Sequence, residues 1–144
     1  MAYDATKLAM SKDELQDFLD EVFPQVRGDF AVEALEPMNV RMRLLVQDKH
    51  LRPGGTVSGP TMFALCDVAV YVGVLAMIGP KALAVTTNSS MDFMRKPAAG
   101  RDLIAECEIL KLGRVLAVGD VRLYSEGDAR AVARAGMTYS IPPN

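Results

Sequence analysis

The first hydrophobic pattern in the chain has the spacing of an amphipathic helix. Residues 12–23 read KDELQDFLDEVF, in which apolar side chains recur every three or four positions. Ser11 precedes this run and Glu14 stands three residues after Ser11, which is the spacing of a capping box. We therefore predict a short helix that begins after Ser11 and ends near Pro24.

Alternating apolar and polar positions predict strands elsewhere in the chain. In residues 38–46, Val40, Met42 and Leu44 alternate with polar side chains, and residues 102–111 alternate in the same way. Glycines at 113 and 127 provide turns between the later runs. The further segments that we predict as strands are 30–36, 82–96, 115–124 and 131–141.

Residues 59–78 read GPTMFALCDVAVYVGVLAMI and are apolar on every side of a helix. The run is long enough to cross a bilayer, but Asp67 would lie near the bilayer centre, and basic anchors are missing from its flanks. We therefore predict the buried central helix of a globular domain, ended by Gly79 and Pro80, and no membrane partner.

The order of predicted elements is helix, two strands, a long loop, the apolar helix, and four strands. An antiparallel sheet wrapped around one long central apolar helix buries all of these hydrophobic faces together, so we predict an α+β fold. No repeat or linker divides the chain. We expect a single domain over residues 1–144, with an N-terminal helical segment at 1–27 and the core at 28–144.

Charge and cysteine content narrow the functional classes. The net charge is −2 with both signs interleaved, which does not favour a nucleic-acid partner. Cys66 and Cys107 lie in apolar runs without CxxC spacing, which favours reduced cysteines, and no secretory signal precedes them, so we expect a cytoplasmic location. A lone histidine, His50, cannot complete a metal site.

The start of the apolar helix carries the first candidate chemistry. Ser58 suits the N-cap and Pro60 suits the first turn. We expect free N–H groups at Gly59 and Thr61, which together with the helix dipole would stabilise an oxygen that gains negative charge. Because Gly59 has no side chain, a substrate carbonyl could approach its N–H closely.

Asp67 lies eight residues after Gly59, which brings it round toward the face on which the helix begins. Phe63 and Tyr71, four residues to either side, share the face of Asp67. A carboxylate that loses solvation there suits a general base or a nucleophile. The alternative is a structural aspartate that caps a neighbouring loop or pairs with an arginine across an interface.

Three runs resemble a known family: GGTVSGPTMFALCDVA, TTNSSMDFMRKPAAG and KLGRVLAVGDVRLYSEGD. They resemble the hotdog-fold acyl-CoA thioesterases of the phenylacetate-degradation-associated (PaaI-like) family, from about residue 45 to the end. The resemblance implies a hotdog fold and hydrolysis of an acyl-CoA to the free acid and CoA. It implies no redox cofactor and no metal, with CoA entering only as part of the substrate.

The same resemblance implies roles for three residues. Gly59 would polarise the thioester carbonyl through its backbone N–H, and Asp67 would act as base on water or as nucleophile. Thr87, ten residues before Pro97, would orient the attacking water. Family members assemble so that the aspartate comes from one subunit and the helix N-terminus from its partner, which implies a homodimer or a dimer of dimers.

Two positions depart from the family pattern, and they affect substrate binding. Ser58 stands where the family has histidine, and Arg52 stands where a polar residue, often asparagine, is usual. Arg52 is either a solvated loop charge or a contact to a substrate anion. The further residues that we predict to bind substrate are Pro60, Phe63, Tyr71 and, for the CoA phosphates or merely as a charged rim, Arg95, Lys96 and Arg114.

Two other functions compete with the thioesterase interpretation. The Ser58 and Arg52 departures would also fit a non-catalytic acyl-CoA-binding or structural hotdog module. His50 lies nine residues before Gly59, the spacing of hotdog hydratases and dehydratases, but Phe63 occupies the place of their glutamate. We therefore predict that the chain is an acyl-CoA thioesterase and that His50 is a loop residue.

Overall fold

The computed structural model describes residues 3–143, and these contain two α-helices and one sheet. The helices are α1 (Lys12–Val22) and α2 (Gly59–Ile78), and the short 3-10 turns are η1 (Pro24–Val26) and η2 (Asp48–His50). The strands are β1 (Phe30–Glu36), β2 (Asn39–Leu44), β3 (Val85–Phe93), β4 (Leu103–Leu112), β5 (Leu116–Ser125) and β6 (Ala131–Ser140).

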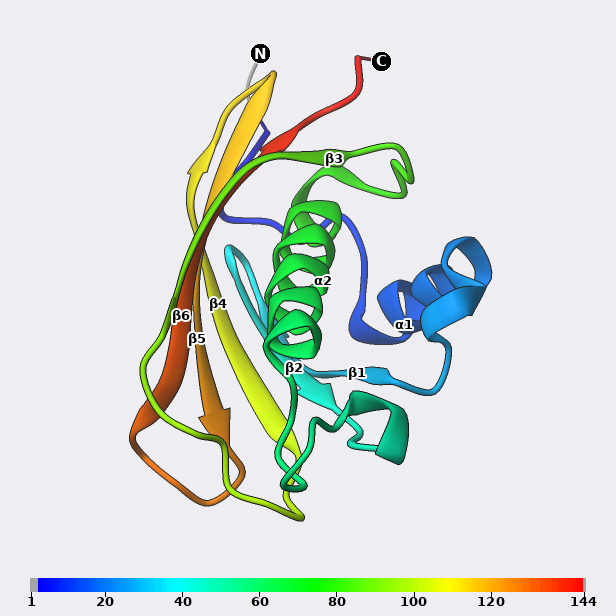
Figure 1. Ribbon diagram of the computed structural model, residues 1–144. Helices are drawn as coiled ribbons and strands as arrows, with labels where there is room; N and C mark the ends of the chain where they lie inside the picture. The colour runs from blue at the N-terminus through cyan, green and yellow to red at the C-terminus, as the bar shows by residue number, and fades with distance from the viewer. Residues whose placement is uncertain (1–2, 144) are drawn as a thin grey trace.

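The strands of the described residues form one antiparallel sheet in the order β1-β2-β4-β5-β6-β3. Helix α2 lies along one face of the curved sheet, and α1 lies beyond the β1 edge (Figure 1). Strand β3 follows α2 in the chain but pairs with β6, the last strand, at the far edge of the sheet. The predicted α+β arrangement around a central apolar helix is confirmed.

Helix α2 is the centre of the hydrophobic core. Leu65 and Val70 are fully buried. A Cβ atom at Gly73 would lie 3.2 Å from Ile109 of β4, and one at Gly119 of β5 would lie 3.0 Å from Val70. Glycine at these two positions therefore lets the helix lie close on the sheet.

By length and composition α2 would also suit a membrane span. However, 72% of its most apolar window is buried inside the protein. A helix that is covered by its own sheet needs no polar face, which explains why it is apolar all round.

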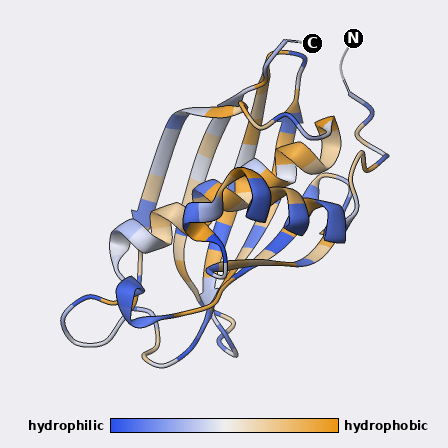
Figure 2. Ribbon diagram, turned by 90° about the vertical axis from the view of Figure 1, so that its right-hand side faces the viewer, coloured by the Kyte–Doolittle hydropathy of each residue, from blue (hydrophilic) through white to orange (hydrophobic). Residues whose placement is uncertain are grey.

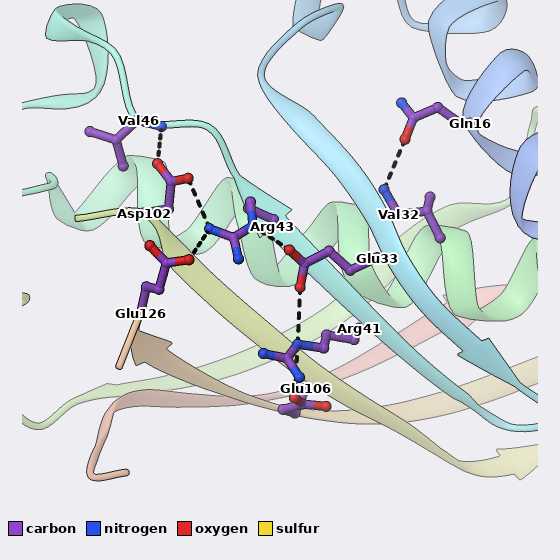
Figure 3. Close-up of polar contacts among 9 residues, drawn as sticks. All are labelled: Gln16, Val32, Glu33, Arg41, Arg43, Val46, Asp102, Glu106 and Glu126. Atoms are coloured by element: carbon purple, nitrogen blue, oxygen red, sulfur yellow. Dashed lines mark hydrogen bonds and ion pairs between the residues drawn. The ribbon is translucent and has the colours of Figure 1, made fainter. Parts of the chain in front are cut away.

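The sheet face turned away from α2 is polar. Figure 2 shows bands of hydrophobic and polar residues alternating along the strands, and in β2 the buried Val40 and Met42 alternate with Arg41 and Arg43, as predicted. Figure 3 shows the ion pairs that these two arginines make with carboxylates of neighbouring segments. The carboxylates are Glu33, Asp102, Glu106 and Glu126.

Two predicted strands are longer than the observed ones. Met38 was expected inside β2 but has φ 68° and lies with Pro37 in the β1–β2 turn. Strand β3 was expected over 82–96 but covers Val85–Phe93. At its start the N–H of Ala84 donates to Lys81, and after its end the N–H groups of 94 and 95 share one carbonyl, so neither flank continues the ladder.

The two edges of the sheet differ in how they are covered. Gln16 of α1 donates to the carbonyl of Phe30 at 3.2 Å and accepts from the N–H of Val32 at 2.8 Å, so α1 covers the β1 edge (Figure 3). At the other edge β3 has a strand neighbour on one side only, among the described residues. Val85 and Phe93 of β3 are 57% and 55% exposed. An open edge of this kind is ready to pair with another chain.

Candidate active site

Asp67 opens onto a cavity of about 320 Å³ between α2 and the start of β3. Besides Asp67, only apolar residues and the hydroxyl-bearing Tyr71, Thr86 and Tyr139 line it. The apolar lining comes from the end of α1 with its C-cap, from helix α2, and from the loop into β3 with the first residue of that strand: Val22, Phe23, Val68, Ala82, Leu83, Ala84 and Val85. The cavity therefore combines an apolar wall with a single carboxylate, as sites for apolar substrates commonly do.

The carboxylate of Asp67 is held by two hydroxyl groups. The hydroxyl of Thr86 on β3 donates to Oδ1 at 2.5 Å, and that of Tyr139 on β6 lies 2.7 Å from the same oxygen. Neither an arginine nor a lysine of the described residues pairs with Asp67. Within the described residues of one chain, Asp67 is therefore not locked in a salt bridge.

Tyr139 is buried directly behind Asp67. Only 3% of it is exposed, and its hydroxyl also lies 3.0 Å from the backbone oxygen of Asp67. Burial, reinforced by the nearby Asp67 charge, raises the pKa of Tyr139. The phenol therefore stays protonated and can act toward Asp67 only as a donor.

Tyr71 and Phe63 were both predicted to share the face of Asp67, and the structure separates them. Tyr71 lines the cavity, donates to the carbonyl of Ala82 at 2.9 Å, and places its ring 6.1 Å from that of Tyr139. Burial raises the pKa of Tyr71. Phe63 is 38% exposed and does not line this cavity.

Thr87 was predicted to orient water near Asp67, and this placement is wrong within the chain. Its hydroxyl donates to the carbonyl of Thr138 at 3.3 Å, whereas the neighbouring Thr86 reaches the carboxylate. The register of β3 against β6 shifts between Thr86 and Asn88. Within one chain, Thr86 and not Thr87 is therefore the hydroxyl of this segment that contacts Asp67.

The N-terminus of α2 is built largely as predicted. Ser58 is the N-cap, and its hydroxyl accepts from the N–H of Thr61 at 3.3 Å. Pro60 occupies the first turn, where its missing N–H costs nothing. Because the N–H of Thr61 donates to Ser58, the expectation that it is free is wrong. For the N–H of Gly59 the described residues supply no acceptor, as expected.

Gly59 opens onto a different cavity, of about 410 Å³. Three cationic side chains line it, namely Arg52, Arg95 and Lys96, together with Phe93, whose ring would lie 3.6 Å from a Cβ at Gly59. The remaining lining residues are Thr56, Val57, Met62, Met94 and Pro97. Cations beside a free helix N–H suit a ligand that carries negative charge.

Arg114 does not belong to this cationic group. It lies in the turn between β4 and β5. Arg95 and Lys96 lie near the opposite end of these two strands, because the N–H of the nearby Ala98 donates to Ser125, the last residue of β5. The predicted trio is therefore reduced to a pair within one chain.

One chain does not bring Asp67 to the start of its own helix. The two groups line separate cavities, and the helix rise between them is about 12 Å. Eight residues carry Asp67 more than two turns along α2, so the helix by itself does not bring the two groups of one chain together.

His50 lies buried in η2, apart from both cavities. Its Nδ1 accepts from the N–H of Gln47 at 2.9 Å, and its Nε2 lies 3.6 Å from Asp29. Asp29 is only 5% exposed and also contacts Lys49 at 2.9 Å. These contacts describe a histidine that organises the loop before α2, in agreement with its interpretation as a loop residue.

A further hollow of about 490 Å³ lies on the polar face of the sheet. Charged side chains of both signs line it, and Arg41 pairs there with Glu106 at 3.4 Å. Because side chains of both signs lie together in it, this hollow does not favour a ligand of one charge.

Tyr139 and Thr86 were missed by the sequence analysis. Every second residue of this part of β6 faces the core, and Tyr139 continues the series after Ala135 and Met137. A buried phenol usually has a hydrogen-bond partner. Because the core helix contains one acidic residue, the inward-facing Tyr139 could have been predicted to pair with Asp67. For Thr86 the sequence offers no such signal.

Comparisons with known proteins show the family of the chain. Residues 54–132, more than half of the chain, match the family model of the thioesterase superfamily. A crystal structure of a thioesterase candidate from Silicibacter sp. TM1040 is 59% identical, with a TM-score of 0.92 and 99% of both chains covered. A mutant of the phenylacetic acid degradation protein PaaI from Thermus thermophilus is 28% identical, with a TM-score of 0.71 over 83% of this chain and 99% of that one.

Among curated proteins, acyl-coenzyme A thioesterase 13 from Homo sapiens is 23% identical over 118 residues. The similar region covers 81% of this chain and 82% of the human protein. A similarity over most of both chains concerns the domain as a whole and not a single motif.

Proposed function

The chain belongs to the thioesterase superfamily, as the resemblance predicted, and from that premise we propose that it hydrolyses acyl-CoA thioesters to the free acid and CoA. The observation that carries this proposal is the carboxylate of Asp67 at the apolar cavity, held by hydroxyls and not by a cation. The names of the similar PaaI and acyl-coenzyme A thioesterase 13 support the choice of substrate class.

Asp67 would act as general base or as nucleophile. As a base it takes a proton from water, the oxygen of that water adds to the thioester carbon, and the carbonyl oxygen becomes an oxyanion. Collapse of this intermediate breaks the C–S bond, and the CoA thiolate takes up the proton. As a nucleophile, Asp67 would itself expel CoA and form an anhydride, which water then hydrolyses to regenerate the carboxylate.

Gly59 of a second subunit would stabilise the oxyanion. Its N–H is free at a helix N-terminus, and one such donor contributes typically about 10² to 10³ in rate. The open edge of β3 and its exposed Val85 and Phe93 support a homodimer through this strand, because the opposite edge is already covered by α1. Two dimers could then assemble as a dimer of dimers.

The two cavities suggest how the substrate divides between the subunits. The apolar cavity at Asp67 would hold the acyl group. Arg52, Arg95 and Lys96 beside Gly59 would face the CoA phosphates, which suits cationic side chains near a helix N-terminus. The reaction as proposed uses no cofactor or metal, and the free, buried Cys66 and Cys107 are compatible with the cytoplasmic location that we also propose.

A survey of aromatic and aliphatic acyl-CoA substrates tests the proposal, with released CoA followed by a thiol reagent. Cys66 and Cys107 are buried, and burial raises the pKa of Cys66 to about 12, so the protein's own thiols should contribute little background. We expect turnover of at least one thioester and its loss in Asp67→Asn. Tight CoA binding without turnover of any thioester would instead support the non-catalytic module.

A further inference from the structure

Tyr139 and Thr86 are opposite one another in the β3–β6 ladder, and both face helix α2. Their hydroxyls reach the same atom, Oδ1 of Asp67, at 2.7 and 2.5 Å. A cross-strand pair of this kind fixes the spacing of two side chains through the backbone of the sheet. The two donors are therefore positioned by the fold and not by the flexible ends of long side chains.

The other carboxylate oxygen of Asp67, Oδ2, has no hydrogen-bond donor in the part of the chain that the structure describes. The two oxygens are thus not equivalent. Exchanging them by rotation would break two hydrogen bonds at once, one of them to the buried Tyr139. The arrangement holds one oxygen and leaves the other available to water or substrate.

We propose that Tyr139 is a positioning residue of the hydrolase: with Thr86 it holds Oδ1 of Asp67, so that Oδ2 is the oxygen that acts on water or on the thioester. This inference rests on the proposed function and assigns its chemistry to one atom.

The surroundings of Asp67 contain few groups that could disturb this assignment. The titratable groups brought against it are Tyr139 from β6 and Tyr71 and Cys66 from α2, while Thr86 of β3 is neutral. Burial raises the pKa of Tyr139, Tyr71 and Cys66, so all three stay neutral at neutral pH. Among the described lining residues Asp67 is the one charged side chain, and α1 and its C-cap contribute only Val22 and Phe23.

Tyr139→Phe is the direct test, because it removes the hydroxyl and keeps the buried ring. Loss of one donor to a charged group should move the acid limb of the kcat/KM profile to higher pH by about one unit and lower kcat about tenfold. Thr86→Val should move the limb in the same direction, whereas Thr86→Ser keeps the hydroxyl and should restore the wild-type profile. A merely structural tyrosine would lower stability without moving the limb.

A folded Tyr139→Phe enzyme with the wild-type pH profile and kcat would overturn the inference. If that variant does not fold, 3,5-difluorotyrosine at position 139 is a stronger donor of the same shape and should move the limb to lower pH. An unchanged limb would again overturn it. Failure of the proposed function can be told apart from failure of this inference. If the wild type turns over no thioester, the proposed function fails. ¹³C NMR of the Asp67 carboxyl then still tests the contact, because its titration midpoint should shift in Tyr139→Phe.

Discussion

Gly59 and Asp67 belong to one helix and yet open onto different cavities of the same chain. Their separation along the helix axis is about 12 Å, which is far greater than the contact distances that a single thioester carbonyl can make. Two copies related by a twofold axis would solve this problem, since each copy would present both ends of the site to the other. The exposed edge of β3 is the surface through which we expect that pairing.

Mixing two inactive variants should therefore restore activity. Asp67→Asn removes the carboxylate, and Gly59→Pro removes the N–H at a helix position where proline is tolerated, after an N-cap whose φ of −73° and ψ of 155° suit the residue before a proline. A heterodimer of the two carries one intact site and one doubly defective site. Random co-assembly should recover roughly a quarter of wild-type activity, measured on co-expressed and separately tagged chains.

Gly59→Ala is the matched control for this experiment. It keeps the N–H, and its Cβ would lie in ordinary contact with Phe93 at 3.6 Å, so this variant should retain substantial activity. No recovery in the mixed heterodimer, with both parents dimeric and folded, would mean that Asp67 and Gly59 do not serve one site across two subunits.

Cations beside Gly59 should act on substrate binding and not on the chemical step. Arg95→Ala or Lys96→Ala removes one charge from the cavity lining, and KM for an acyl-CoA should rise about fivefold at low salt with kcat unchanged. Arg114→Ala, in the distant β4–β5 turn, is the control and should leave KM unchanged. An equal effect of all three substitutions would indicate a general charge effect in place of a phosphate contact.

The sequence was sufficient to predict the elements because their periodicities are strong. The apolar run in α2, the alternation in β2 and β4 and the Ser11–Glu14 capping box all match the structure. Strand order does not follow from periodicity, since it depends on pairings between distant segments. Asp67 and Tyr139 illustrate this, because they lie 72 positions apart in the chain and meet only when β6 crosses behind α2.

Local backbone irregularities limited the prediction of the site. The register shift between Thr86 and Asn88 displaces the strand alternation by one position, and Thr86, which motif spacing did not select, is the hydroxyl that reaches Asp67. Met38 with φ 68° likewise ends a strand that alternation would have extended. Both features depend on how the chain closes in three dimensions, and neither leaves a mark in hydrophobic patterning.

Phe23 should influence which acyl groups the enzyme prefers. It lies at the C-terminal end of α1, is 38% exposed and lines the Asp67 cavity. Phe23→Ala would enlarge that cavity, so the ratio of kcat/KM for a bulky acyl-CoA to that for acetyl-CoA should rise several-fold. Leu110→Ala, on exposed β4 surface outside the cavity, should leave the ratio unchanged; a change there equal to that of Phe23→Ala would contradict the assignment.

Asp29 should make stability fall in acid. Burial alone would raise the pKa of Asp29, but Lys49 at 2.9 Å and His50 at 3.6 Å lower it overall. A carboxyl whose folded-state pKa lies below its ordinary value stabilises the fold above that ordinary value, near pH 4, and loses this contribution as pH falls through the folded-state pKa. In urea unfolding from about pH 6 to about pH 3, Asp29→Asn should therefore lose less stability than the wild type. Parallel curves would contradict this assignment.

Arg43 and Arg41 provide a comparison of two arginines on the same strand and face. Arg43 is 20% exposed at its side chain and pairs with Glu33, Asp102 and Glu126, so its removal leaves several carboxylates close together without their shared partner. Arg41 is 46% exposed, and solvent screens its pairs. Arg43→Met should therefore lower the free energy of unfolding by about 2 kcal/mol, against less than about 1 kcal/mol for Arg41→Met.

Methionine preserves the length of the apolar stem in both variants, so a difference in urea unfolding reports the charge contacts. Equal losses would show that the Arg43 contacts add no more to stability than an ordinary surface pair, and that β2 is held instead by Val40, Met42 and Leu44 on its buried face.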